Sequence, residues 1–84
     1  MSRKAVLKVK VEPGTFSSER SVSFKAGDKS YSLLCDEGDV MGDSMRVYIV
    51  AQENGQAMID LPRETFTTGN RIIVPEECLQ YIIG

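Results

Sequence analysis

The chain has 84 residues, of which 42% are hydrophobic and 26% are charged, and its formal net charge at neutral pH is −2. These values are typical of one globular domain that buries a core without disulfide or metal staples. The sequence also excludes a transmembrane helix, because none of its apolar runs approaches the ~20 residues that span a bilayer. Lysines interrupt the apolar run after the basic start of the chain, so no signal peptide is visible and we expect a cytoplasmic location.

Charge is unevenly distributed along the chain. Residues 1–34 contain seven Lys and Arg against three acidic residues, whereas residues 35–84 contain three against nine. A compact fold mixes these two halves in space, so the gradient alone does not indicate nucleic-acid binding.

The residue types that common catalytic and metal sites require are missing. The sequence contains no His, the usual general base and zinc ligand. It also contains no nucleophile elbow, P-loop or dinucleotide fingerprint. Its two cysteines, Cys35 and Cys78, are too few for a disulfide framework, and we expect buried free thiols. We therefore predict a protein without catalytic activity, cofactor or metal, and keep an enzyme only as a third hypothesis.

The first strand is predicted over residues 5–11. Leu7, Val9 and Val11 alternate with two lysines, as in an antiparallel strand with one buried and one solvated face.

A β-hairpin is predicted next, from residues 20–26 and 29–35. Gly27 opens its two-residue loop and suits a type II′ turn, whose twist matches that of the strands. This loop length pairs Phe24 with Tyr31 on the inner face. The outer face is polar and consists of Ser21, Ser23, Lys25, Ser30 and Ser32.

Residues 36–44 are predicted to form an acidic, glycine-containing connection. A hard cation binds clustered carboxylate oxygens, but the spacing here does not match an EF-hand. We expect a solvated loop, and the sequence leaves cation binding open. The acidic residues are Asp36, Glu37, Asp39 and Asp43.

Residues 45–61 are predicted to form the hairpin that organises the fold, because β-branched and aromatic residues flank an Asn-Gly turn signal at 54–55. A two-residue loop would pair Ile49 with Asp60, whereas a three-residue loop that includes the preceding Glu pairs Ile49 with Ile59. We predict the longer loop, because it places the aliphatic residues on one face. Its cross-strand pairs are Ala51–Ala57, Ile49–Ile59 and Val47–Leu61.

The other face of this hairpin is more apolar than a solvated strand face usually is. It carries Arg46, Tyr48, Val50, Met58 and Asp60. Either another strand, a barrel wall or the C-terminal tail covers this face, or it is a partner-binding patch.

The remainder of the chain is predicted to form short elements. We expect a helical turn at 61–65, a strand at 71–74, and a second helical turn after Pro75, with Leu79 packing back onto the core. The tail at 80–83 either continues as a last strand or docks elsewhere.

Six short strands, tight turns and no long amphipathic helix indicate an all-β fold. We predict one domain, a small antiparallel barrel of SH3-like or OB-like size, with five to six strands and one short helical turn near the C-terminus. The segment Arg71-Ile72-Ile73-Val74-Pro75, with a turn ending at Leu79, resembles the final strand of SH3-like barrels. This resemblance covers only that segment and specifies no family.

Two loops share a pattern that suits an anion. The loops before Arg20 and Arg71 each place an aromatic residue and hydroxyl groups ahead of the arginine. If the two loops meet, their hydroxyl, N–H and guanidinium groups suit a phosphate or carboxylate. The alternative is two ordinary strand lead-ins, with Phe16 and Phe66 in the core.

Lysines of the first strand form a second basic feature. Lys8 and Lys10, with Lys4 and Lys25, could follow a nucleic-acid backbone, but the chain has no Trp for base stacking and is acidic overall. Solubilising lysines are the alternative.

Two functions are therefore predicted, neither of which involves a membrane. The first is a non-catalytic interaction module or accessory subunit that binds a protein partner or a second copy. Its candidate residues are Arg46, Tyr48, Val50, Met58 and, from the apolar tail, Tyr81. The second is a small barrel that binds an anion or nucleic acid through Lys8, Lys10, Arg20 and Arg71.

Overall fold

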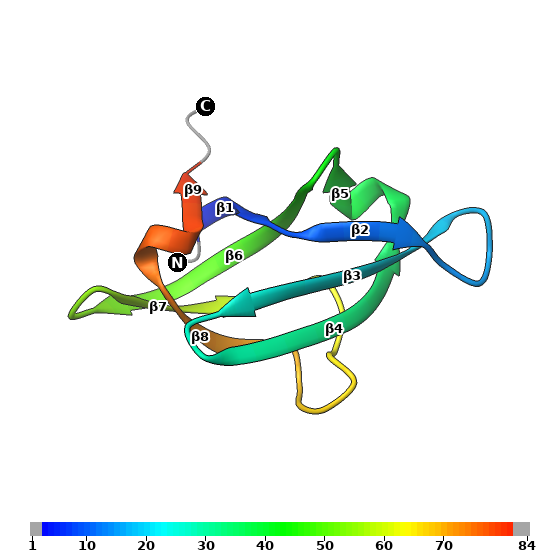
Figure 1. The fold of residues 1–84 in the computed structure, drawn as a ribbon. Helices are drawn as coiled ribbons and strands as arrows, with labels where there is room; N and C mark the ends of the chain where they lie inside the picture. Colours follow the sequence, from blue (N-terminus) through cyan, green and yellow to red (C-terminus); the bar gives the residue numbers. More distant parts are fainter. Residues whose placement is uncertain (1–2, 82–84) are drawn as a thin grey trace.

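A computed structural model describes residues 3–81, which form two antiparallel β-sheets. The strands are β1 (Arg3–Lys8), β2 (Lys10–Pro13), β3 (Glu19–Ala26), β4 (Lys29–Asp36), β5 (Val40–Met41), β6 (Ser44–Glu53), β7 (Gln56–Asp60), β8 (Arg71–Pro75) and β9 (Leu79–Tyr81). Two 3-10 turns, η1 (Glu37–Asp39) and η2 (Glu76–Cys78), lie between strands. The larger sheet has the order β8-β7-β6-β1-β9, with β5 paired to β6, and the smaller sheet has the order β2-β3-β4 (Figure 1).

One bent segment, made of β1 and β2, links the two sheets. β1 pairs with β6 and β9 in the larger sheet, whereas β2 pairs with β3 in the smaller sheet. The ladder breaks at Val9, whose N–H donates to the carbonyl of Asp43 at 2.7 Å. Leu7 and Val9 are buried while Lys8 and Lys10 are exposed, so the predicted alternation of this strand is confirmed.

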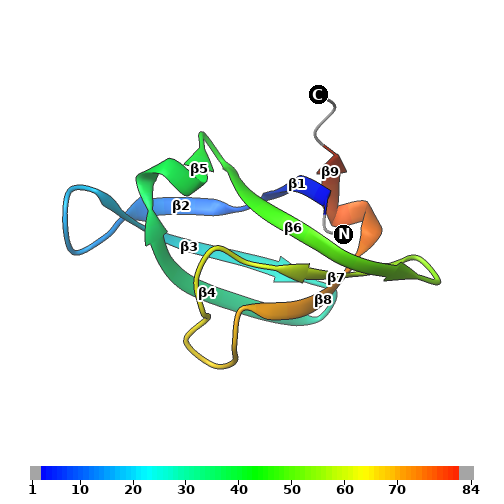
Figure 2. The same cartoon turned by 180° about the vertical axis from the view of Figure 1, so that it is seen from behind.

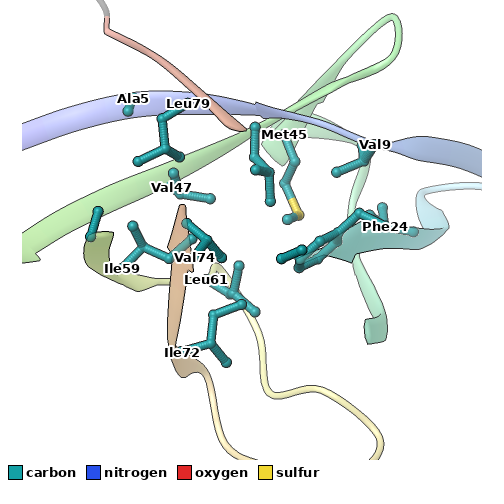
Figure 3. Close-up of a cluster of buried hydrophobic side chains, with 14 of the residues drawn as sticks. Ala5, Val9, Phe24, Met45, Val47, Ile59, Leu61, Ile72, Val74 and Leu79 are labelled. Atoms are coloured by element: carbon teal, nitrogen blue, oxygen red, sulfur yellow. The ribbon is translucent and has the colours of Figure 1, made fainter. Parts of the chain in front are cut away.

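The core lies between the two sheets, where their inward-facing side chains meet (Figure 3). Each strand contributes alternate residues, because successive side chains of a strand point to opposite faces. Full burial of one aliphatic side chain stabilises the fold by roughly 1.5–3 kcal/mol. The largest fully buried side chains are Leu33, Met45, Ile59, Val22, Val47 and Val74.

The β3–β4 hairpin confirms the sequence prediction. Phe24 pairs with Tyr31, and their rings stack with centroids 5.3 Å apart. Gly27 opens the turn with a φ of +64°, which L side chains rarely adopt. Here the hydrophobic pattern and the turn chemistry agree on a single register.

The β6–β7 hairpin resolves its two registers in a way that was not predicted. Asn54 and Gly55 both have positive φ (54° and 80°), as in a two-residue type I′ turn, so the predicted three-residue loop is wrong. Ile49 nevertheless pairs with Ile59, because the register shifts at a β-bulge between Ile49 and Ala51. Val50 is therefore the extra residue of β6.

This bulge also changes the predicted side-chain faces. Ala51 pairs with Met58 and is exposed, whereas Ala57 is fully buried opposite Gln52. The predicted Ala51–Ala57 pair is therefore wrong.

The fold is all-β, as predicted, but no closed barrel is found in residues 3–81. β4 and β8 are the end strands of their sheets, and no ladder joins them. The loop between β7 and β8 makes an isolated bridge from Thr65 to Leu33, and the N–H of Phe66 donates to the carbonyl of Ser32 at 3.0 Å. We call the gap between the edges of β4 and β8 the seam between the sheets. One part of this seam is thus bridged.

The helical turn predicted at 61–65 is absent. The hydroxyl group of Thr65 donates to the carbonyl of Thr68 at 2.7 Å and accepts the Thr68 N–H at 2.9 Å. These side-chain bonds shape the turn at 65–68, while the N–H of Leu61 donates to the carbonyl of Asn70 and Thr65 bridges to Leu33. The turn predicted after Pro75 is present as η2, and the residues after it continue as β9 on β1.

Candidate interaction surface

The outer face of the larger sheet carries the first set of predicted site residues. β6, β7 and β8 are neighbours in this sheet and can be followed in the view from behind (Figure 2). Met58 of β7 pairs with Ala51 on one side and with Ile73 on the other, so one apolar row crosses all three strands.

We define the outer patch as Tyr48, Val50, Met58 and Ile73. Val50 and Met58 are half-buried, Tyr48 is 38% exposed and Ile73 is 54% exposed. Because Tyr48 and Ile73 are exposed, no other strand of residues 3–81 fully covers this face. The expectation that another strand covers it is therefore not met within the described residues.

Sequence reasoning missed Ile73, although a signal for it existed. Ile73 lies between Ile72 and Val74, both of which are buried. The alternation of a strand therefore requires Ile73 to face outward. Ile73 lies beside Met58 because β7 pairs with β8, and the sequence alone did not predict this pairing.

A charged row lies beside the outer patch. Asp60 pairs across the strands with Tyr48 and with Arg71. The Arg71 guanidinium donates to the two carboxylate oxygens of Asp60, at 2.7 Å from Nε and 3.0 Å from Nη2. These hydrogen bonds lower the pKa of Asp60 and raise the pKa of Arg71. Arg71 is therefore already bound to a carboxylate and is poorly placed to hold a second anion.

The other predicted arginine is engaged in the same way. Arg20 donates to the carbonyls of Ser17 and Glu19 at 2.8 and 2.9 Å, and to a carboxylate oxygen of Glu37 at 3.2 Å. Arg20 lines a hollow at the β2–β3 loop, whereas Arg71 lines a different hollow beside β8. The structure does not bring the two arginines into one site.

The aromatic residues of the two lead-in loops are exposed. Phe16 is 70% and Phe66 is 67% exposed, so the prediction that they belong to the core is wrong. Each loop is instead held by a backbone hydrogen bond, the first loop to η1 and the second to the middle of β4. The N–H of Glu37 donates to Ser18 and the N–H of Phe66 donates to Ser32.

The predicted lysine stripe is divided between the two sheets. Lys8 pairs with Ser44 in the larger sheet, whereas Lys10 pairs with Ser23 in the smaller sheet. The strand bends at Val9 between them, and Lys10 forms an ion pair with Glu12 at 3.3 Å. One of the two predicted lysines therefore already has a carboxylate partner.

Tyr81 lies apart from the outer patch along the sheet. It pairs with Ala5 in β9, and β1 separates β9 from β6. Ile82 and Ile83 of the predicted apolar tail lie outside the described residues. Arg46 is exposed in β6, as predicted, and pairs with Val6.

The cysteines and the acidic connection form no common site. Cys35 is buried and Cys78 half-buried, and both are free thiols. Burial, with a smaller contribution from Asp39 and Asp36, raises the pKa of the Cys35 thiol. Within residues 3–81, no three His, Cys, Asp or Glu side chains gather where a metal ion could bind.

Two hollows adjoin the outer patch. One of about 380 Å³ lies at the β6–β7 turn and reaches Met58 and Ile73. The other, of about 760 Å³, lies between the β3–β4 turn and β8, at the unbridged part of the seam.

Comparisons with known protein families, with curated proteins and with solved structures found no match. None of the helical segments in the described part of the chain has the length and apolar character needed to cross a membrane.

Proposed function

We propose that this chain is a non-catalytic protein-interaction module, a partly open small barrel that docks on a protein partner through the outer patch. The observation that carries this proposal is the position of Ile73 beside Met58. An exposed aliphatic side chain on an edge strand extends the apolar row of the hairpin across three strands. Contiguous exposed apolar surface of this kind marks interaction sites in monomeric proteins.

The charged row gives the patch the composition of an interface. Apolar and aromatic side chains form the centre of a typical interface, with charged groups at its rim. Here Tyr48, Met58 and Ile73 are bordered by Arg46 and by the Asp60–Arg71 ion pair.

Binding of an anion or nucleic acid has weaker support. Both candidate arginines donate to carboxylates, and Lys10 is ion-paired with Glu12. A phosphate ligand would have to displace these internal ion pairs.

The test is affinity capture from source lysate with the double variant Tyr48→Ser/Val50→Ser, at low and high salt, with and without nuclease. A captured partner is then purified and its affinity for each variant is measured. The matched control, Ser23→Ala/Ser32→Ala, changes a directly paired couple on the outer face of the smaller sheet. We expect binding of the partner to persist at high salt and after nuclease treatment. We expect the control variant to bind the partner normally and the patch variant not to bind it.

Two results would refute the proposal. Binding that disappears with nuclease or falls steeply with salt would favour the phosphate ligand instead. Loss of the fold in the patch variant, detected by circular dichroism, would show that this face belongs to the core.

A further inference from the structure

The free edge of β8 is the feature of the surface with the most specific chemistry. β8 ends the larger sheet, so only one of its two edges is paired within residues 3–81. The ladder with β7 is regular over its five residues, from Gln56–Pro75 to Asp60–Arg71. Two hydrogen bonds bracket it, from the N–H of Leu61 to Asn70 at 2.8 Å and from the N–H of Glu76 to Gly55 at 2.9 Å.

These two bonds fix the direction of every backbone group in β8. Hydrogen-bonded and non-hydrogen-bonded pairs alternate along an antiparallel ladder. Counting inward from both ends, Ile72 and Val74 bond to β7, and Ile73 does not. The N–H and C=O of Arg71 and Ile73 therefore point outward from the free edge.

Pro75 fits this arrangement. It lacks an N–H, but at its position that group would point away from β7, so no bond of the ladder is lost. Its carbonyl precedes η2 and serves as the acceptor of the first i→i+3 bond of that turn, so the outward groups of the edge are those of Arg71 and Ile73. Pro75 and Arg71 protect the two ends of the strand, while three β-branched residues, 72–74, occupy its unprotected centre.

A hollow of about 760 Å³ lies beside this edge. Its walls come from β8, from the β3–β4 turn, including Ser30 and Tyr31, and from Thr67 and Thr68. This volume lies within the ~300–1,000 Å³ range of sites that enclose small ligands. The bridge at Thr65 closes the seam further along β4, so the hollow is the open remainder.

We propose that the docking partner supplies one extended segment of four to five residues, which adds to the free edge of β8 as a further strand. This inference rests on the proposed function and adds to it the free edge of β8, the strand that carries Ile73 of the outer patch. The bound segment would exchange hydrogen bonds with Arg71 and Ile73. An apolar residue opposite Ile73 would continue the row of Ala51, Met58 and Ile73.

A single segment fits this site better than a second copy of the chain. A copy would bring its own β8 with its own β3–β4 turn and 62–70 loop beside it. Those elements flank the edge in both molecules, so they obstruct the edge-to-edge pairing of two β8 strands. Strand addition by an isolated extended peptide has no such obstruction, and main-chain bonds supply its affinity.

The probe is a phage-displayed library of random nonapeptides selected on the full chain. Selected peptides are synthesised and titrated into the ¹⁵N-labelled protein. We expect enriched peptides with β-branched residues at alternate positions. We also expect amide shift changes centred on Arg71 and Ile73, slower hydrogen exchange of the Ile73 amide, and intermolecular contacts typical of paired strands.

Three changes separate backbone pairing from side-chain contact. N-methylation of the peptide amide that faces the Ile73 carbonyl is expected to weaken binding roughly tenfold, since one hydrogen bond is lost and one group remains buried. Ile73→Pro removes the outward N–H and is expected to do the same, while Ile73→Thr keeps both backbone groups and retains more affinity. The N-methyl peptide tests the pairing even if Ile73→Pro does not fold.

Several results would overturn strand addition. If no peptide is enriched, or N-methylation has no effect, the edge does not receive a strand. If peptides shift Tyr48 and Val50 but leave the Ile73 amide unchanged, the outer patch docks partners and strand addition is wrong. If the free protein dimerises and its Ile73 amide is already protected, a second copy occupies the edge.

Discussion

Replacing Ile72 and Ile73 separately by Ala tests whether the outer patch is surface or core. The two residues are neighbours in β8 with the same side chain, but Ile72 is 6% and Ile73 is 54% exposed. An Ile→Ala change at a buried site costs about 2–5 kcal/mol of unfolding free energy. Full burial of an Ile side chain contributes roughly 1.5–3 kcal/mol, so the half-exposed Ile73 should cost about 1 kcal/mol.

The assay is urea unfolding of both variants beside the wild type, with the slope of each transition compared. Thermal unfolding gives a second measure, because 1 kcal/mol shifts the Tm of a domain of this size by about 4–8 °C. We expect Ile72→Ala to lose at least twice as much stability as Ile73→Ala, with equal slopes. Equal losses, or a larger loss for Ile73→Ala, would show that the outer face is covered and would refute the interaction surface.

Two further predictions concern the core and the turn. Because burial raises the pKa of the Cys35 thiol above its ordinary value of 9.0, its stabilising contribution is present below pH 9 and is lost as the pH rises through the folded-state pKa. Urea titrations should therefore show the wild type losing more stability than Cys35→Ala above pH 9, and a constant difference between them would contradict this. Gly55→Ala should cost about 1–2 kcal/mol, since its φ of +80° is unfavourable for an L side chain. Gly38→Ala is the control, because a Cβ there meets no atom within 4 Å, and equal costs at both positions would argue against the turn geometry.

Features that depend on local signals were predictable from the sequence. The β3–β4 hairpin was found because the alternation of Val22 and Phe24 and the turn at Gly27 specify the same register. The Pro75 turn and the burial of Leu79 follow from equally local signals. In each case, one interpretation satisfied both the turn chemistry and the burial pattern.

Features that depend on contacts between distant segments were not predictable. Phe16 and Phe66 look like core residues in the sequence, yet both lie in loops on the surface. The carboxylate partner of Arg20 comes from η1, and Ile73 becomes part of the outer patch only because β8 pairs with β7. No periodicity within one segment contains this information.

The β6–β7 hairpin lies between these two cases, because its local signals conflict by one residue. The Asn-Gly turn requires a two-residue loop, whereas burial requires Ile49 to pair with Ile59. The chain satisfies both requirements by leaving Val50 unpaired in a bulge. The bulge places Val50 and Ala51 together opposite Met58, and so widens the outer patch.

The bulge between Ile49 and Ala51 predicts the effect of deleting single residues in the middle of the sheet. Deleting Val50 removes the extra residue, so the turn and the Ile49–Ile59 pair are retained in a regular ladder. We expect this variant to fold, at a cost of about 1–2 kcal/mol for the half-buried side chain. Deleting Met58, the residue opposite, makes Ala57 and Ile59 neighbours, and successive residues of a strand cannot both face the core. We expect that variant not to fold cooperatively, as measured by urea unfolding and by the dispersion of amide resonances. If both deletions unfold the chain, or both are tolerated, the bulge does not reconcile the turn with the core.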